Sequence, residues 1–185
     1  MRIIGGHHKG KKISFVKSST TRPLRDYVKE NIFNIILHSN KINFDLINTN
    51  VLDLYSGTGS FGIECLSRGA RNVTFVDDDQ IANKILVKNI KQLKIENKCK
   101  VLNINVNNFL NSNKKKFDII FLDPPFMENN YLEDLKLIKK LKAFNKDHII
   151  IFHREIKKLE KISNLLKNVV IKKYGRSKIV FSSFN

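Results

Sequence analysis

The sequence predicts an α/β fold, in which a mostly parallel sheet of seven strands is flanked by helices and ends in an antiparallel hairpin. Three observations predict it. Short apolar runs recur along the chain, segments of helical length separate them, and a turn containing glycine joins the last two runs. Parallel strands need crossover helices, whereas a short turn joins antiparallel strands. The length of 185 residues fits one domain, and residues 1–40 form a small basic N-terminal arm and a helix that pack on that domain.

The predicted strands are the apolar runs that Gly, Asn, Asp or Lys residues bound. Five of these strands occupy residues 51–55, 73–76, 100–104, 117–122 and 148–152. The last two, residues 169–174 and 178–183, flank Gly175 and form the hairpin.

The predicted helices have apolar residues spaced three and four positions apart, which places them on one face. These helices cover residues 24–38, 60–67, 80–93, 131–141 and 155–166. Residues 1–16 contain three glycines and short apolar stretches, which predict a small irregular hairpin. Residues 111–116 are interpreted as a polar connector.

The charge of the chain indicates a polyanionic partner, RNA or DNA. Lys and Arg number 34 against 17 Asp and Glu, a formal net charge of +17. A field of this sign attracts nucleic acid. Coding rich in A+T is the alternative explanation, because most of the basic residues are Lys, and Asn and Ile are abundant as well.

The distribution of this charge favours a binding arm, since residues 1–29 contain eight basic residues and one acid. Arg154, after the fifth predicted strand, is a further candidate for a phosphate contact, although a solvated loop explains it equally well. The candidate RNA contacts of the arm are Arg2, Lys9, Lys11, Lys12, Arg22 and Arg25.

Bulk features predict a cytoplasmic protein that contacts no membrane and holds no metal. Cys65 and Cys99 have no spacing that suggests a disulfide or a zinc site, and the histidines show no ligand spacing. No run of 18 uncharged apolar residues occurs, and the first residues do not resemble a secretion signal. A monomer is the default expectation.

A glycine pattern follows the first predicted strand, with Gly57, Gly59 and Gly62 spaced as G-x-G-x-x-G. Glycine lets the backbone approach a ligand closely where a strand turns into a helix. Asp77 ends the next strand, where it would accept hydrogen bonds from a ribose, and this much fits NAD equally well. Asp53 favours S-adenosylmethionine instead, because a carboxylate in the first strand repels a pyrophosphate and attracts a cationic methionine end.

Other cofactor contacts are predicted around the loop and after the next two strands. Alternatives stay open for the acids, because Asp53 could cap a turn and Asp77 could be one of several acids at a helix N-terminus. Asp79 is interpreted as the cap of that helix. The further candidates are Tyr55, Ser56, Asp78, Asn105 and Val106, with Phe109 placed where an adenine ring would rest.

The candidate catalytic residues directly follow the fourth predicted strand and are Asp123, Pro124, Pro125 and Phe126. Ligands bind at strand ends beside the topological switch of such sheets. The Asp123 carboxylate and the Pro124 carbonyl would accept the two N–H groups of an exocyclic amine, and Phe126 would stack on a base flipped out of its helix. The alternative is a simple turn, because Asp-Pro and Pro-Pro are common in loops.

This combination resembles the class I S-adenosylmethionine-dependent methyltransferases, and more narrowly the 16S rRNA (guanine-N2)-methyltransferase D (RsmD) family. The resemblance covers nearly the whole chain, and its opening arm and Thr-Arg-Pro segment are more specific than the glycine loop. It rests on Met1-Arg2-Ile3-Ile4-Gly5-Gly6, Lys9-Gly10-Lys11-Lys12, Thr21-Arg22-Pro23, Asp53-Leu54-Tyr55-Ser56-Gly57-Thr58-Gly59, Glu64-Cys65-Leu66-Ser67-Arg68-Gly69-Ala70, Asp123-Pro124-Pro125-Phe126 and Tyr174-Gly175.

The resemblance implies methylation of one guanine in 16S rRNA within a partly assembled 30S particle, with Arg22 and its neighbours holding RNA or cofactor. The chain departs from the family at Asp77, where Glu is usual, and at Asn105, where Asp is frequent. Three rivals stay open. These are a methyltransferase acting on adenine N6 in DNA or on a protein glutamine amide, a non-catalytic RNA-binding subunit, and an NAD oxidoreductase.

Overall fold

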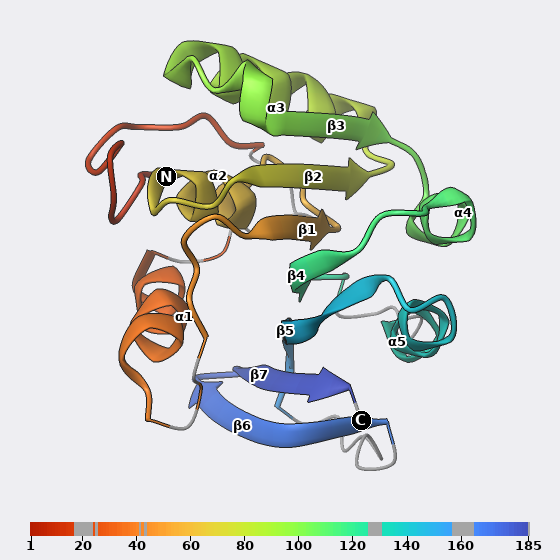
Figure 1. Ribbon diagram of the computed structural model, residues 1–185. Coiled ribbons are helices and arrows are strands. Elements are labelled where there is room, and N and C mark those ends of the chain that lie inside the picture. Colours follow the sequence, from red (N-terminus) through yellow and green to blue (C-terminus); the bar gives the residue numbers. More distant parts are fainter. Residues whose placement is uncertain are drawn as a thin grey trace.

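The computed structural model describes residues 1–16, 24, 26–40, 42, 44–125, 131–156 and 165–184, with the backbone alone at residues 168 and 169 (Figure 1). The strands of this part of the chain form one seven-stranded sheet in the order β3-β2-β1-β4-β5-β7-β6. They are β1 (Asn50–Leu54), β2 (Asn72–Asp77), β3 (Cys99–Asn103), β4 (Phe117–Leu122), β5 (Phe144–Glu155), β6 (Leu166–Tyr174) and β7 (Ser177–Phe184).

The helices are α1 (Asp26–His38), α2 (Ser60–Ser67), α3 (Gln80–Leu93), α4 (Val106–Ser112) and α5 (Tyr131–Lys140), with one 3₁₀ turn at Glu96–Lys98. Within the described ranges, none of these helices has the length and apolar character needed to cross a membrane.

The predicted fold class is confirmed, including the mostly parallel sheet and the antiparallel β6–β7 hairpin. One predicted helix was wrong at both ends. Glu155 belongs to β5 and Leu166 begins β6, while residues 157–164 lie outside the described part of the chain. The helix α4 was not predicted, because its seven residues include three Asn and one Ser and show less than two turns of apolar periodicity.

The topological switch lies between β1 and β4. From β1 the chain moves outward through β2 and β3, and then returns to the other side of β1 to form β4 and β5. All four neighbouring pairs among β1 to β5 are parallel, so the loops that follow β1 and β4 leave the sheet side by side. A crevice at this position is where ligands bind in open α/β sheets.

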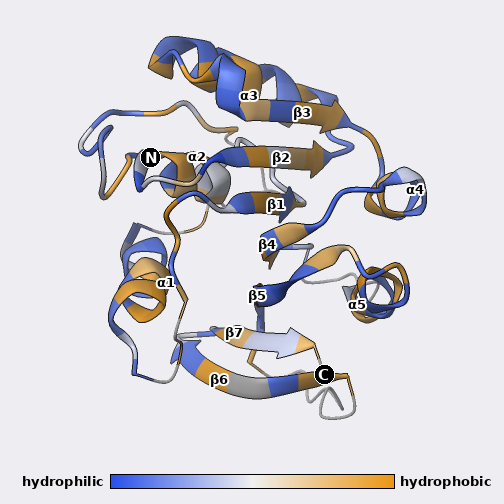
Figure 2. Ribbon diagram, viewed as in Figure 1, coloured by the Kyte–Doolittle hydropathy of each residue, from blue (hydrophilic) through white to orange (hydrophobic). Residues whose placement is uncertain are grey.

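Alternate residues of the strands pack on opposite faces, and different helices cover each face (Figure 1). Val51 and Phe121 face the cluster built by α1, α2 and α3, whereas Leu52 and Leu122 face the cluster built by α4 and α5. Figure 2 shows hydrophobic residues along the central strands and a mixture of hydrophilic and hydrophobic residues on α3. Covering both faces explains why these strands are apolar almost throughout.

The N-terminal residues form the predicted irregular hairpin, with an antiparallel bridge between Arg2 and Lys12. Its backbone is fixed to α2, because the Ile4 and Gly5 amides each donate to the Glu64 carboxylate over 2.8 Å. A second attachment runs through Asn89 of α3, whose side chain bonds both backbone groups of Ser14. The arm is therefore held against two helices that flank the glycine loop.

A buried ion pair completes this attachment. The side chains of Lys29 in α1 and Glu64 in α2 are both fully buried, with Lys29 Nζ 3.6 Å from Glu64 Oε2. Lys29 Nζ also donates to the Arg2 carbonyl over 2.7 Å, and Arg68 Nε donates to Glu64 Oε1 over 2.8 Å. Burial lowers the pKa of Lys29, and the neighbouring Glu64 charge opposes that shift.

Candidate cofactor and catalytic site

The described residues among those predicted to bind the cofactor or act in catalysis lie at one edge of the sheet, here called the carboxyl edge, where β1 to β5 end. The register aligns Leu54 with Val76 and with Leu122, and Leu122 with Phe152. The loops that follow these strands are therefore brought together by backbone pairing alone. This confirms the placement of the glycine loop and of the segment starting at Asp123 beside the topological switch.

The glycine loop turns sharply between β1 and α2. Tyr55, Gly57 and Gly59 all have positive φ, at 57°, 52° and 82°. The turn is closed by hydrogen bonds from the Ser56 amide to the Val76 carbonyl and from the Gly59 amide to the Ser56 carbonyl. Glycine adopts such angles without strain, while Tyr55 carries the cost of a left-handed conformation.

Asp77 holds this loop in place. One carboxylate oxygen accepts from the Gly57 amide over 2.7 Å, and the other accepts from the Asp79 amide over 2.9 Å. Burial raises the pKa of Asp77, and these two hydrogen bonds oppose the rise. Asp79 caps α3 as predicted, since its carboxylate accepts from the Ile81 and Ala82 amides.

Asp53 is 1% exposed and lies under the same loop. Its carboxylate accepts from the Gly62 amide over 2.9 Å, which gives the first turn of α2 an acceptor that Gly59 at the N-cap cannot supply. Burial raises the pKa of Asp53 well above its ordinary value, and the nearby charges of Asp123 and Asp77 add to the rise. Three carboxylates thus gather at the carboxyl edge.

These features fit a ligand with a cationic end. No lysine or arginine of the described ranges forms an ion pair with Asp53 or Asp77. The Ser56 hydroxyl is buried in the loop without a hydrogen-bond partner among the described residues. A group with a positive charge and polar atoms would complement both, as the methionine part of S-adenosylmethionine would. The cofactor therefore fits the residues present.

The remaining cofactor candidates differ in their positions. Tyr55 directs its hydroxyl to Asp134 of α5 over 2.7 Å, so its ring is oriented toward α5. Asp78 is exposed at the end of β2. Asn105 is exposed and caps α4 by accepting from the Asn107 amide, while Val106 is buried beneath the helix. Phe109 is also buried, at 5% exposed, which leaves little of its ring for an adenine.

The segment starting at Asp123 continues the chain beyond β4 at the carboxyl edge. The Asp123 amide bonds the carbonyl of Leu54, the last residue of β1, over 3.4 Å, so the segment starts beside the glycine loop that follows β1. Pro124 is buried and Pro125 is exposed. Phe126 lies outside the described residues.

Sequence reasoning missed one residue at this point, His153. Its Nδ1 lies 2.9 Å from Oδ1 of Asp123, and both side chains are mostly buried. The signal was available, because His153 directly follows the apolar run of β5 at the level of Asp123 after β4. It also missed Lys29, Glu64 and Asn89, which lie in helical patterns that give no sign of buried polar partners.

The predicted RNA contacts fall into three groups. Arg2, Lys9, Lys11 and Lys12 are exposed on the N-terminal hairpin. Arg22 and Arg25 lie outside the described residues. Arg154 is fully buried with its guanidinium carbon 4.2 Å from the Tyr131 ring centroid, so in this structure it offers no surface to a phosphate. Its place in the core favours a packing role in place of the predicted phosphate contact.

No group of three or more His, Cys, Asp or Glu side chains in the described ranges has the arrangement of a metal site. Both cysteines are free thiols. Burial raises the pKa of the Cys99 thiol to about 12, which keeps it protonated and unreactive at neutral pH.

Comparison with known proteins places the chain among relatives of the same length and fold. A candidate rRNA methyltransferase of Bacillus subtilis, YlbH, is 35% identical over 171 residues, which are 90% of each chain. Ribosomal RNA small subunit methyltransferase D of Buchnera aphidicola subsp. Baizongia pistaciae is 30% identical over 183 residues, covering 99% of this chain and 90% of the relative.

A solved structure agrees with these relatives. The structure of yhhF from Escherichia coli superposes with a TM-score of 0.85 at 26% identity and covers 100% of this chain and 98% of the other. The model of the family described as Conserved hypothetical protein 95 matches residues 1–183. The chain therefore belongs to this family, that of ribosomal RNA small subunit methyltransferase D, and has the fold of the class I methyltransferases.

Proposed function

We propose that this protein transfers a methyl group from S-adenosylmethionine to the exocyclic N2 amine of a guanine in 16S rRNA, acting on a 30S assembly particle in the cytoplasm as a monomer. The observation that carries the proposal is the position of Asp123 and Pro124 directly after β4 at the topological switch, where the Asp123 amide bonds the carbonyl of Leu54, the last residue of β1 before the glycine loop. Family membership and the names of the relatives support the rRNA substrate.

The cofactor would bind in the crevice between the glycine loop and the start of α3. Its cationic methionine end would lie near Asp53 and Ser56, and its ribose near Asp77, with the adenine toward Asn105 and Val106. Asp53 acts mainly through its field, because its carboxylate is buried and already accepts from Gly62. S-adenosylmethionine supplies an electrophilic methyl group on a sulfonium, whose positive charge is lost when the methyl leaves.

The chain would activate the amine by hydrogen bonding. The lone pair of an exocyclic amine is delocalised into the ring, so the nitrogen attacks well only when it becomes pyramidal. Asp123 and the Pro124 carbonyl would each accept one N–H group and draw the nitrogen toward that shape. After the new C–N bond forms, the nitrogen loses one proton, which Asp123 would hold until it passes to water. Placing the amine and methyl in line would supply most of the rate.

The base must leave its stack to reach this crevice. Phe126 is proposed to stack on the flipped guanine, and the exposed residues of the N-terminal hairpin to hold the RNA backbone. The formal charge of +17 favours binding of RNA as a polyanion. The rival substrates, adenine N6 in DNA and a protein glutamine amide, would use the same acceptors. The experiment therefore has to distinguish rRNA, DNA and protein as the methylated substrate.

The test is methyl transfer from radiolabelled S-adenosylmethionine to 30S particles, naked 16S rRNA, genomic DNA and total protein in parallel, with nucleoside analysis of the product. Asp123→Ala should bind cofactor normally and lose turnover. Asp147→Ala is the matched control, because Asp147 is an exposed carboxylate near the start of β5, remote from the carboxyl edge. It should keep full activity.

Label in N2-methylguanosine from 30S or 16S substrate is the expected result. Label found only in DNA or protein would show that the substrate is DNA or protein and not rRNA, while the proposed methyl-transfer chemistry would stand. Cofactor binding without any transfer would favour the non-catalytic RNA-binding subunit, and binding of NAD in its place would favour the oxidoreductase. Undiminished turnover of Asp123→Ala would overturn the proposed mechanism.

A further inference from the structure

We propose that His153 is a positioning residue that fixes the side chain of Asp123, so that one carboxylate oxygen is held by the protein and the other is presented to the substrate amine. This inference rests on the proposed function, because it concerns how Asp123 is kept in its acceptor geometry.

Asp123 and His153 are in direct contact. β4 and β5 are neighbours in parallel register, with Leu122 opposite Phe152, so Asp123 and His153 follow at the same level. His153 Nδ1 lies 2.9 Å from Asp123 Oδ1, and the two side chains are 14% and 21% exposed. A carboxylate oxygen only accepts, so Nδ1 carries the hydrogen in this pair. Within the described part of the chain, no group donates to Asp123 Oδ2.

Asp123 lacks the usual local way of fixing its side chain. An aspartate in a turn commonly accepts a hydrogen bond from the backbone amide two residues later. Here the next two residues are Pro124 and Pro125, which have no N–H group to donate. The chain therefore has to orient the Asp123 carboxylate through another element, and β5 supplies the donor.

His153, the donor, lies on a more rigid element than Asp123. Asp123 lies in a loop after β4, and its own amide makes only a 3.4 Å hydrogen bond to Leu54. His153 lies within β5, where it is paired with Ile179 of β7, a fully buried residue. A side chain that projects from the middle of a paired strand holds its direction better than one on a loop. The His153 imidazole is thus the more rigid partner of the pair.

A hydrogen bond to Oδ1 also counters repulsion. Burial is the main cause of the raised pKa of Asp53, and the Asp123 charge adds to it, because two like charges near each other tend to move apart. The bond to His153 holds Asp123 in the crevice against that tendency. The two oxygens of Asp123 then have different roles, because Oδ1 is bonded to His153 and Oδ2 faces the amine.

The experiment compares two substitutions at this position. His153→Asn places an amide nitrogen near the position of Nδ1 and keeps a donor, whereas His153→Leu fills similar space without one. We expect His153→Leu to lower kcat by about 10- to 100-fold, since misplacing a reacting group by about 1 Å has effects of this size. The cofactor Kd should stay within about twofold, and His153→Asn should recover kcat to within about threefold of the natural protein.

Two outcomes would overturn the inference. Normal kcat in His153→Leu, beside lost turnover in Asp123→Ala, would remove the positioning role and leave the proposed function intact. An equal loss in His153→Asn and His153→Leu, with the same fall in Tm, would show a packing role. Crystal structures of both variants provide a readout independent of turnover. Asp123 should occupy one rotamer in His153→Asn and several in His153→Leu, and a single unchanged rotamer in both would contradict the inference.

Discussion

Asp53 of β1 and Gly62 of α2 are joined by a hydrogen bond of 2.9 Å between a buried carboxylate and the backbone amide of the first helical turn. The bond bridges the glycine loop and fixes where α2 begins. It also keeps an acidic group out of water, close to the charges of Asp77 and Asp123. Asp53 therefore stabilises the fold through its hydrogen bond and destabilises it through its buried charge.

Asp53→Asn should make the protein more stable and weaken cofactor binding. Asn keeps an acceptor for the Gly62 amide but removes the buried charge, so we expect a gain of about 1–2 kcal/mol at pH 7. For a chain of this size that corresponds to a rise in Tm of about 2–8 °C. Calorimetry measures the shift, and titration with S-adenosylmethionine measures the affinity, which should fall at least about tenfold. Asp147→Asn is the control.

The pH dependence of stability should change in the same variant. The pKa of Asp53 is raised from 3.8 in the folded chain, so the folded state retains a proton that the unfolded state has lost. The contribution of Asp53 to the free energy of unfolding therefore declines as pH rises from about 4 toward the folded pKa. Urea unfolding between pH 4 and 8 should show this contribution in the natural protein and lack it in Asp53→Asn. Parallel curves for the two proteins would contradict the assignment.

Asp77→Ala should reduce cofactor affinity more than Asp78→Ala. The Asp77 carboxylate bonds the amides of Gly57 and Asp79, so its loss releases the glycine loop as well as the proposed ribose contact. We expect at least about a tenfold increase in the cofactor Kd, equivalent to about 1.4 kcal/mol. Asp78 is exposed and its side chain holds no loop amide among the described residues. Isothermal titration compares the two, and equal losses would contradict the distinction.

Gly62→Ala should destabilise the protein through a steric clash. An added Cβ would lie 2.7 Å from Cγ1 of Val73 and would also overlap the ring of Phe75. Overpacking of this kind costs about 1–3 kcal/mol. The second substitution Phe75→Leu removes the ring atoms and should recover part of the loss. Thermal unfolding of the single and double variants measures the coupling, and additive effects would show that the two positions are independent.

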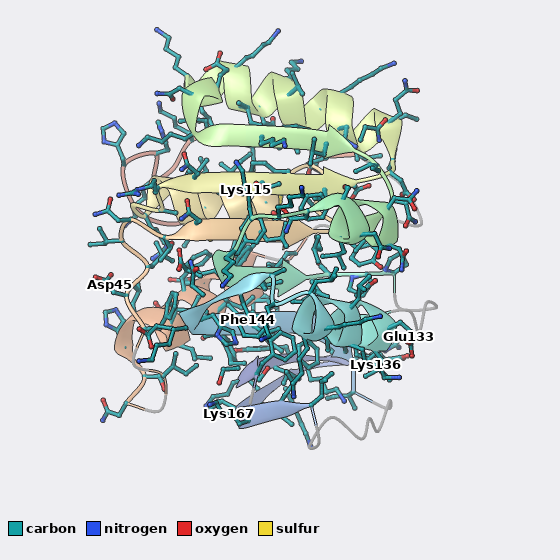
Figure 3. All side chains as sticks on the ribbon, turned by 45° about the vertical axis from the view of Figure 1, so that its right-hand side comes forward. Asp45, Lys115, Glu133, Lys136, Phe144 and Lys167 are labelled. Carbon is teal, nitrogen blue, oxygen red and sulfur yellow. The ribbon has the colours of Figure 1, made fainter. Side chains whose placement is uncertain are left out.

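Glu64→Gln should destabilise the protein far more than Glu133→Gln. Glu64 is fully buried and accepts from Ile4, Gly5 and Arg68, so removing its charge leaves Lys29 buried without a counter-charge. Breaking a buried pair costs about 3–5 kcal/mol. Glu133 forms an exposed pair with Lys136 on α5 (Figure 3), where an ion pair contributes less than about 1 kcal/mol. Urea unfolding and hydrogen exchange at the Ile4 and Gly5 amides test both effects.

The two ends of the N-terminal hairpin should differ in RNA binding. Arg2 and Lys12 face each other across a bridge near Lys29 and Ser60, beside the start of α2. Lys9 and Lys11 lie toward the hairpin tip, which packs on Ser67 at the other end of α2. Removing Arg2 and Lys12 together should lower RNA affinity more than removing Lys9 and Lys11 together. Each lost phosphate contact should reduce the slope of log affinity against log salt by about one.

The control for this charge removal is the triple substitution of Lys114, Lys115 and Lys116 by Ala. These residues precede β4 at the opposite edge of the sheet and are exposed. Filter binding to 16S rRNA across a range of salt concentrations compares all three variants. A loss for the triple variant as large as that for Arg2 and Lys12 would indicate binding by overall charge.

The amino-acid pattern was sufficient to predict the seven strands, the helices α1, α2, α3 and α5, and the placement of the candidate site residues after β1, β2 and β4. Hydrophobic periodicity reports which backbone faces the core, and a parallel sheet brings all its carboxyl ends to one edge. A helix cap was also predictable from the local sequence, as Asp79 at the start of α3 shows. The short, asparagine-rich α4 was missed because its neighbours in space, not its own pattern, make it a helix.

Only the tertiary structure decided which polar side chains meet. The pairs Lys29–Glu64, Asn89–Ser14 and His153–Asp123 join positions that are 30 to 75 residues apart, and no local spacing reports them. It also placed Arg154 in the core, although its position after an apolar strand suggested an exposed residue. Sequence periodicity thus determined which segments form the strands, because burial acts on each segment locally. Pairing of buried charges depends on how separate segments pack, so the fold alone determined it.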